Sequence, residues 1–253
     1  RVTKAGTLLA FCEGREGGDS SDIDMLVRRS EDNGNTWSEK QVVWDEDRNV
    51  AGNPCPVQDA ETGTIWLLMT WNDSTDGNTA LHNGSAKHSR RVFVCHSKDD
   101  GRTWSKPVDI TASTKKPDWW WYATGPGVGI QLHQGPHKGR LVIPCDFTSA
   151  EGYGSHVIFS DDHGSSWQLG GAVMGGCNEC QVVELANGTL LLNMRMQENG
   201  KGQRAIATST DGGATWSDLR FDPTLVDPVC QASVLRYSLS SEDGKNRILF
   251  SNP

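Results

Sequence analysis

Two charged residues late in the chain, Glu179 and Arg195, have the types and the spacing of a functional pair. Glu179 opens one apolar run and Arg195 closes the next, 16 residues further on. Two short apolar runs joined by a turn predict a β-hairpin, which places these opposite charges side by side. The planar fork of an arginine can hold a carboxylate through two hydrogen bonds. The alternative is a plain cross-strand ion pair, which contributes little to stability.

A second charged group, Arg15 and Asp19, stands in a polar, glycine-rich stretch at residues 13–24, between two apolar runs. A loop of this kind presents charged side chains at the mouth of a β-propeller, the fold that the repeats described next indicate. The alternative is a pair of ordinary solvated loop charges.

An octad of the form S-x-D-x-G-x-[ST]-W occurs four times, at residues 30–37, 97–104, 160–167 and 209–216. Its Ser and Asp can bond nearby backbone groups, its Gly accepts positive φ, and its Trp can close a turn against a strand. An apolar, β-rich run precedes three copies, and a weaker one precedes the fourth. The octads therefore predict turns between strands.

The octads start at residues 30, 97, 160 and 209, so their separations are 67, 63 and 49 residues. Such distances suit a four-stranded blade with connecting loops of varying length. The spacing predicts an all-β fold, a β-propeller. Because the octad serves the fold, none of its residues is a candidate for the functional site.

Composition agrees with one large all-β domain: 253 residues with 28 Gly, 10 Pro and 10 Trp, and no long helical period. The net charge of −8, with both signs interspersed, argues against a nucleic-acid partner or an anionic membrane surface. No apolar run approaches the roughly 18–20 residues of a membrane span.

The seven cysteines are an odd number, so at least one is free unless it pairs between chains. Residues 177–180 form a C-x-x-C, but no second pair or His cluster completes a zinc site. We expect mostly buried thiols, no metal and no cofactor.

Four segments resemble the family-33 sialidases, the exo-α-sialidases or neuraminidases. They are A-F-x-E-x-R followed by I-D at residues 10–24, N-P-C-P at 53–56, W-x-x-Y-A-x-G-P-G at 119–127, and the E-C-Q and N-x-R of 179–195. The octad is the Asp box, a motif of sialidases and of several unrelated propellers.

This resemblance implies two catalytic residues. Asp19 would be the acid/base carboxylate, and Glu179 would activate a tyrosine nucleophile. Asp22 competes with Asp19, which is preferred because residues 19–24 match the family register without a gap. The tyrosine itself is expected beyond Pro253.

The resemblance also implies five residues that bind substrate. Arg195 would clamp the carboxylate of sialic acid, Arg15 would contact the sugar beside Asp19, and Asp118 would face the sugar. Asn53 and Tyr153 are further candidates for the pocket, Asn53 with a turn role as its alternative.

The implied function is an exo-α-sialidase, a retaining glycoside hydrolase that releases terminal sialic acid from glycans, glycoproteins or glycolipids, secreted or periplasmic. Residues 1–253 would cover four to five blades of one six-bladed catalytic domain, incomplete at both ends and inactive alone. A propeller that binds glycans or proteins without catalysis is the alternative from another class. A trans-sialidase is the rival within the enzymes.

Overall fold

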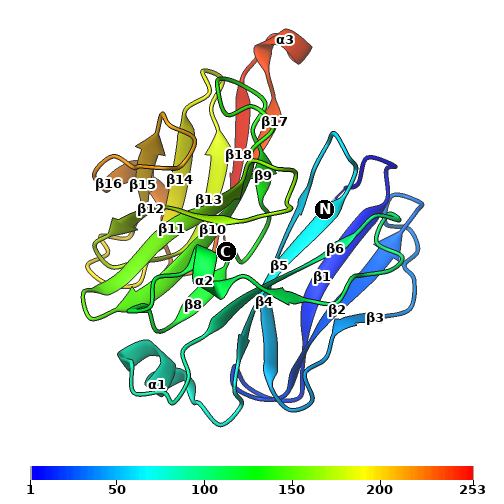
Figure 1. The fold of residues 1–253 in the computed structure, drawn as a ribbon. Helices are drawn as coiled ribbons and strands as arrows, with labels where there is room; N and C mark the ends of the chain where they lie inside the picture. The colour runs from blue at the N-terminus through cyan, green and yellow to red at the C-terminus, as the bar shows by residue number, and fades with distance from the viewer. Residues whose placement is uncertain (1, 253) are drawn as a thin grey trace. The chain divides into compact units, whose positions relative to one another are not determined.

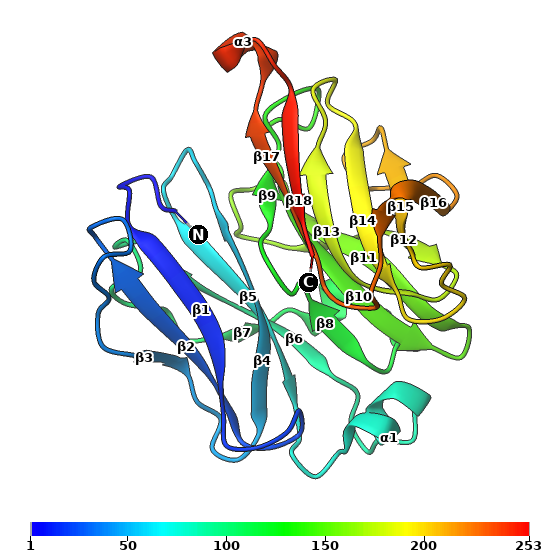
Figure 2. The same ribbon diagram turned by 180° about the vertical axis from the view of Figure 1, so that it is seen from behind.

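The computed structural model describes residues 2–252, which are built mainly from β-strands (Figures 1 and 2). The all-β class predicted from the sequence is confirmed. The chain divides into two compact units: unit 1 runs to Thr124 and includes residues 148–150, and unit 2 comprises residues 125–147 and those from 151 onward. Within the described residues, no helix is long and apolar enough to cross a membrane.

Unit 1 contains one mainly antiparallel sheet, two short helices and a further short strand outside that sheet. Its elements are β1 (Leu8–Arg15), β2 (Ile23–Ser30), β3 (Gln41–Trp44), β4 (Val50–Gln58), β5 (Ile65–Asn72), α1 (Asn78–Asn83), β6 (Arg91–Ser97), β7 (Val108–Asp109), α2 (Thr111–Thr114) and β8 (Tyr122–Thr124). The strand order is β1-β2-β4-β5-β6-β7, and β3 pairs with β2. Only β2 and β4 meet in parallel, at the single pair Ile23 and Val50, so this contact joins two antiparallel meanders.

Unit 2 repeats the same antiparallel pattern. Its elements are β9 (Ile130–Gln131), β10 (Leu141–Ser149), β11 (Gly152–Ser160), β12 (Gln168–Met174), β13 (Cys177–Glu184), β14 (Leu190–Met196), β15 (Gln203–Ser209), β16 (Arg220–Val226), β17 (Ser233–Ser238), α3 (Ser240–Asp243) and β18 (Arg247–Ser251). The strand orders are β12-β11-β10 with β9 beside β10, β13-β14-β15-β16, and the hairpin β17-β18.

All four octads connect consecutive strands, as predicted: β2 to β3, β6 to β7, β11 to β12, and β15 to β16. In the last of them, Asp211 Oδ1 accepts from the Ser209 hydroxyl at 2.7 Å and from the Thr215 N–H at 2.9 Å, and Asp211 Oδ2 accepts from the Thr215 hydroxyl at 2.6 Å. Partial burial alone would raise the pKa of Asp211, but the hydrogen bonds from Thr215 and Ser209 lower it to about 2.

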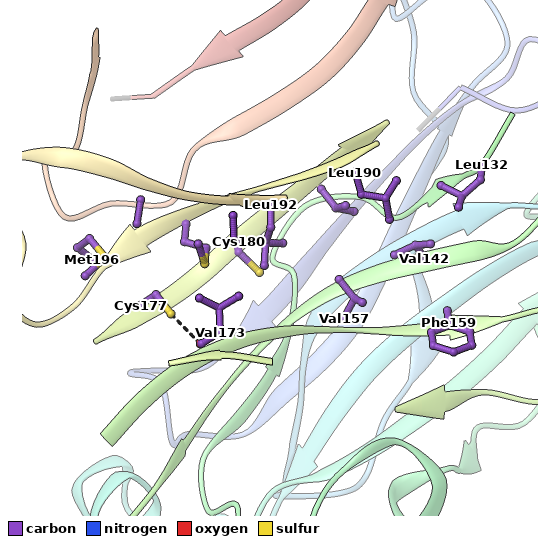
Figure 3. Close-up of a cluster of buried hydrophobic side chains, with 14 residues drawn as sticks. Leu132, Val142, Val157, Phe159, Val173, Cys177, Cys180, Leu190, Leu192 and Met196 are labelled. Atoms are coloured by element: carbon purple, nitrogen blue, oxygen red, sulfur yellow. Dashed lines mark hydrogen bonds between the residues drawn. The ribbon is translucent and has the colours of Figure 1, made fainter. Parts of the chain in front are cut away.

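The main core of unit 2 lies between the β10–β12 sheet and the β13–β16 sheet. Figure 3 shows Val142, Val157 and Val173 facing Cys180 and Leu192 across this interface. Alternate residues of β14 point into this core, and Leu190, Leu192, Met194 and Met196 are all buried in it. Five of the seven cysteines are buried as free thiols, namely Cys55, Cys95, Cys145, Cys177 and Cys180, in agreement with the interpretation from the sequence.

Unit 2 also contains a buried ion pair. The Arg204 guanidinium is fully buried and donates to Asp227 Oδ1 at 3.2 Å, to Asn193 Oδ1 at 2.8 Å and to the Cys230 carbonyl at 2.9 Å. Asp227 Oδ2 in turn accepts from the backbone N–H of Met196 at 2.8 Å. Burial lowers the pKa of Arg204 although the charge of Asp227 raises it. The pair ties the end of β14 to the segment that leads to β17.

The candidate functional residues and the octads lie at opposite ends of the strands within each unit. In unit 1, β2 begins just after the loop that carries Asp19 and ends at Ser30, where the first octad starts. In unit 2, Leu190 at the start of β14 pairs with Ser209, where the last octad starts, and Arg195 is near the other end of β14. The octads therefore shape the sheets away from the candidate site.

The Asp211 contacts predict an acid-dependent loss of stability. The folded carboxyl has a pKa of about 2 against an ordinary value of 3.8, so the unfolded state takes up its proton first as the pH falls. Its contribution is present above about pH 4 and is lost as the pH falls through about 2. Asp211→Asn should lower the free energy of unfolding at pH 7 by about 1 kcal/mol, the net contribution of a hydrogen bond.

Urea denaturation of wild type and Asp211→Asn at several pH values between 7 and 2 measures this difference, which should shrink toward pH 2. Asp218→Asn is the matched control, since Asp218 lies in the same connection and its carboxylate accepts no hydrogen bond among the described residues. A difference between wild type and Asp211→Asn that stays constant down to pH 2 would contradict the prediction.

The buried pair predicts a larger effect. Arg204→Met leaves the Asp227 carboxylate, whose side chain is 2 % exposed, without its cation. Removing one partner of a buried pair costs about 3–5 kcal/mol. Chemical denaturation should show this loss, while Arg220→Met, at an exposed position on the neighbouring strand, should change stability by less than about 0.5 kcal/mol. Equal effects of the two substitutions would refute a special role for the pair.

Candidate active site

The β13–β14 hairpin brings Glu179 and Arg195 together, as the spacing predicted. Arg195 Nη1 donates to Glu179 Oε2 at 2.6 Å, and Arg195 Nη2 donates to Gln197 Oε1 at 2.8 Å. The regular register is interrupted between Cys177 and Cys180, so β13 has an extra residue beside Arg195. A β-bulge of this kind re-aims side chains and is frequent near functional sites.

Both members of this pair are accessible to a ligand. The side chain of Glu179 is 24 % exposed and that of Arg195 is 22 % exposed. Two of the five guanidinium N–H groups of Arg195 are used in these bonds, so the group retains donors for an anion.

Tyr153, on β11, belongs to the same surroundings. Burial raises the pKa of its phenol, the charges of Glu198 and Asp146 raise it further, and the charge of Arg195 lowers it. The phenol is therefore neutral at physiological pH and acts as a hydrogen-bonding group. The fully buried Asp146 accepts from Asn178 Nδ2 at 2.9 Å, which holds the residue next to Glu179.

In unit 1, Arg15 and Asp19 form an ion pair between the end of β1 and the loop that follows. Arg15 Nη1 donates to Asp19 Oδ1, and Arg15 Nε donates to Glu13 Oε2 at 2.6 Å. Partial burial lowers the pKa of Arg15, but the hydrogen bonds and charges of Glu13 and Asp19 outweigh it and raise the pKa above its ordinary value. Asp22, the competing candidate, has no such partner among the described residues.

Asn53 is held inside the framework of unit 1 at a positive φ of 55°. Its backbone N–H donates to Glu13 Oε1 at 2.7 Å, and its Oδ1 accepts from Arg90 Nη1 at 2.6 Å and from the Thr70 hydroxyl at 2.7 Å. Glu13 thus connects Asn53 to Arg15. This geometry is compatible with a role of Asn53 in the turn and with a role in the pocket. Its Oδ1 is occupied, while its Nδ2 donates to no described residue.

Asp118 is exposed, and its carboxylate makes no hydrogen bond or ion pair with the described residues. The tryptophans that follow it differ from one another. Trp119 is 3 % exposed and belongs to the core, while Trp120 and Trp121 are partly exposed. The assignment of Asp118 to sugar binding stays a prediction.

Sequence reasoning gave no role to several residues that hold these groups. Glu13 stood inside the A-F-x-E-x-R pattern, so its spacing was a usable signal. Arg90 and Asn78 lie in a stretch with no motif, and nothing in the sequence connects them with Asn53 and Asp19. Within residues 2–252, no three His, Cys, Asp or Glu side chains gather in a way that could hold a metal ion.

Comparison with known proteins agrees with this picture. Residues 6–252 match the profile of the BNR repeat-like domain. The chain is 36 % identical to a sialidase of Micromonospora viridifaciens, 31 % to a sialidase of Bacteroides fragilis and 33 % to an exo-alpha-sialidase of Aspergillus fumigatus. These alignments cover 99 %, 100 % and 99 % of the chain and 40 %, 48 % and 62 % of the respective relatives.

Solved structures give the same result. The Hadza microbial sialidase Hz136 superposes with a TM-score of 0.87 at 32 % identity, over 100 % of this chain and 52 % of that one. A leech intramolecular trans-sialidase shares the fold at 21 % identity, with a TM-score of 0.84 over 100 % and 54 % of the two chains.

The chain thus spans about half the length of the curated relatives it matches. The resemblance to sialidases drawn from the sequence is confirmed by these matches. Since the profile covers nearly all the described residues, the chain belongs to the BNR repeat-like domain family.

Proposed function

We propose that the full-length protein is an exo-α-sialidase, a retaining glycoside hydrolase that releases terminal sialic acid from glycans, glycoproteins or glycolipids. The Glu179–Arg195 pair carries this proposal, because it joins an accessible carboxylate to an arginine that retains free donors. Sialic acid is itself a carboxylate, which a guanidinium binds through two parallel hydrogen bonds. The named sialidases among the relatives support the same reading.

The proposed reaction has two displacements. In the first, a tyrosine oxygen attacks the anomeric carbon while Glu179 takes the tyrosine proton, and the glycosidic C–O bond breaks with its electron pair going to the leaving oxygen, which receives a proton from Asp19. In the second, water gives a proton to Asp19 and attacks the same carbon, and the tyrosine regains its proton from Glu179. Two inversions retain the configuration.

A tyrosine suits this substrate because it is neutral, and a neutral nucleophile approaches an anionic sugar more easily than a carboxylate does. We assign no residue of this chain to the nucleophile. In the proposed binding set, Arg195 holds the carboxylate, Arg15 contacts the sugar beside Asp19, and Asp118, Asn53 and Tyr153 are further contacts.

We also propose that these strands belong to one catalytic domain, a six-bladed β-propeller. The antiparallel meanders β4–β7 and β13–β16 support it, since each has four strands, as one blade does, and contains one octad. Secretion or export to the periplasm stays a prediction.

The first test is turnover of a fluorogenic sialoside by the full-length protein at mildly acidic pH. Wild type should release the fluorophore, and Asp19→Ala and Glu179→Ala should each lower kcat by about 10²–10⁴-fold, the usual contribution of a general acid or base. A wild type that leaves the sialoside intact while still binding glycans would favour a non-catalytic propeller. Added lactose distinguishes hydrolysis from transfer, because a trans-sialidase would form sialyl-lactose.

The second test is Arg195→Lys, which keeps the charge and loses the fork. Because a lysine ammonium cannot bond both carboxylate oxygens in one plane, binding of a sialic acid analogue should weaken by about 1.5–3 kcal/mol, or roughly 10- to 150-fold. Isothermal titration of the analogue measures this change, with Arg220→Lys as an exposed control. Equal affinity of wild type and Arg195→Lys would remove Arg195 from the binding set.

A further inference from the structure

We propose that Asn78 is a positioning residue for Asp19, and that the loop of residues 73–90 serves to fix it there. This inference rests on the proposed function, since it concerns the proton that Asp19 gives to the leaving oxygen. Asn78 is the first residue of α1, which lies between β5 and β6. In Figures 1 and 2, α1 and the connection from β1 to β2 lie at the same end of the strands of unit 1.

The direct contact is a hydrogen bond from Asn78 Nδ2 to Asp19 Oδ2 at 3.2 Å. Arg15 Nη1 donates to the other oxygen, Oδ1. The Asp19 side chain is 59 % exposed, so little packing restrains its rotation. One donor on each oxygen fixes the plane of the carboxyl group, and each oxygen keeps a lone pair for a proton or a substrate hydroxyl.

The side-chain oxygen of Asn78 is in an unfavourable environment. Its Oδ1 is buried and accepts no hydrogen bond from the described residues. A buried acceptor without a partner is unfavourable, and such a group in a folded protein calls for an explanation. The explanation here is that the nitrogen of the same amide, Nδ2, donates a hydrogen bond to Asp19. An apolar residue cannot make this bond.

The loop that carries Asn78 is closed on itself by Asp76. This carboxylate is 6 % exposed and accepts from the backbone N–H groups of Lys87 at 2.8 Å and of His88 at 3.0 Å. The two halves of the loop are thereby tied together at its base, so α1 does not depend on its own six residues for stability.

Trp121 anchors the loop to the rest of unit 1. Its ring lies between the imidazole of His82, stacked at 4.1 Å between centroids, and the guanidinium of Arg90, 3.6 Å from the ring centroid. Burial, together with the charge of Arg90, lowers the pKa of His82 to about 4. Gly84, at φ +74°, ends α1 against Trp120, and a side chain there would collide with that ring. α1 is thus held at His82 by Trp121 and at its C-terminal end by Trp120.

The test compares two substrates that differ in their need for a proton. Sialyl-lactose has a poor leaving group that must be protonated, whereas 4-nitrophenyl sialoside leaves as a stable phenolate. If Asn78 acts through Asp19, Asn78→Ala should lower kcat/KM on sialyl-lactose, which reports the first displacement, about tenfold or more, part of the ~10²–10⁴ of a general acid, and kcat/KM on the aryl sialoside less than about threefold.

Thr79→Ala is the matched control, because Thr79 is the exposed neighbour on the same helix and its hydroxyl makes no hydrogen bond with the described residues. In an Asp19→Ala background, Asn78→Ala should have no further effect on kcat/KM, since the group it positions is gone. The affinity for a sialic acid analogue should stay within about twofold of wild type, because the change concerns a proton and not sugar binding.

The outcomes separate the two proposals. An active wild type in which Asn78→Ala lowers kcat/KM equally on both substrates, or lowers it further in the Asp19→Ala background, overturns the role of Asn78 and leaves the sialidase activity standing. A folded wild type that turns over neither substrate overturns the proposed function, and the role of Asn78 with it.

Discussion

The hydrogen-bonded aspartate of each octad is the constraint on which the rest of this structure depends. In every copy one carboxylate bonds a serine two residues before it and a Ser or Thr four residues after it, as Asp32 does with Ser30 and Thr36. These contacts are local, so they form wherever the eight residues occur and set the connection between two strands. With one end of each strand pair fixed in this way, the loops at the other end are free to differ in length and composition, and those loops carry Asp19, Asn78 and Glu198.

Two arginine–carboxylate pairs in unit 2 show how burial decides what a charge pair does. Arg204 and Asp227 are withdrawn from solvent, and every atom they bond belongs to the framework, so the pair fixes the backbone at Met196. Arg195, the residue before Met196, forms a shorter contact with Glu179, at 2.6 Å against 3.2 Å, and this pair is partly exposed. An exposed pair adds little to stability, so its conjunction with a β-bulge is better explained by binding than by folding. The buried pair fixes the end of β14, and this end carries Arg195 of the partly exposed pair.

The sequence predicted interactions between residues close along the chain and missed those between residues far apart. The octads, and the hairpin that pairs Glu179 with Arg195, rest on residues close in sequence or on a simple alternation, and both were predicted. The bond from Arg90 to Asn53 and the one from Asn78 to Asp19 join residues 37 and 59 positions apart, through loops without a repeated pattern. Propensity and periodicity carry no information on such pairs, because they arise only after the strands of unit 1 have assembled.

The two hydrogen-bond donors to Asp19 illustrate this difference between contacts that are near and far in sequence. Arg15, which bonds one oxygen, ends β1 four residues before Asp19 and belongs to the A-F-x-E-x-R pattern. Asn78, which bonds the other, comes from a loop that the motif does not reach. If Asp19 is the general acid proposed above, the local donor Arg15 pairs with its charge and the distant donor Asn78 adjusts its orientation. Substitution in the distant loop can then change how readily a given leaving group is protonated without changing which residue protonates it. The loop is anchored at Trp121 and closed by Asp76 independently of Asp19, so such changes need not disturb the fold. On the proposed function, variation in this loop would therefore adjust the orientation of Asp19 without replacing it.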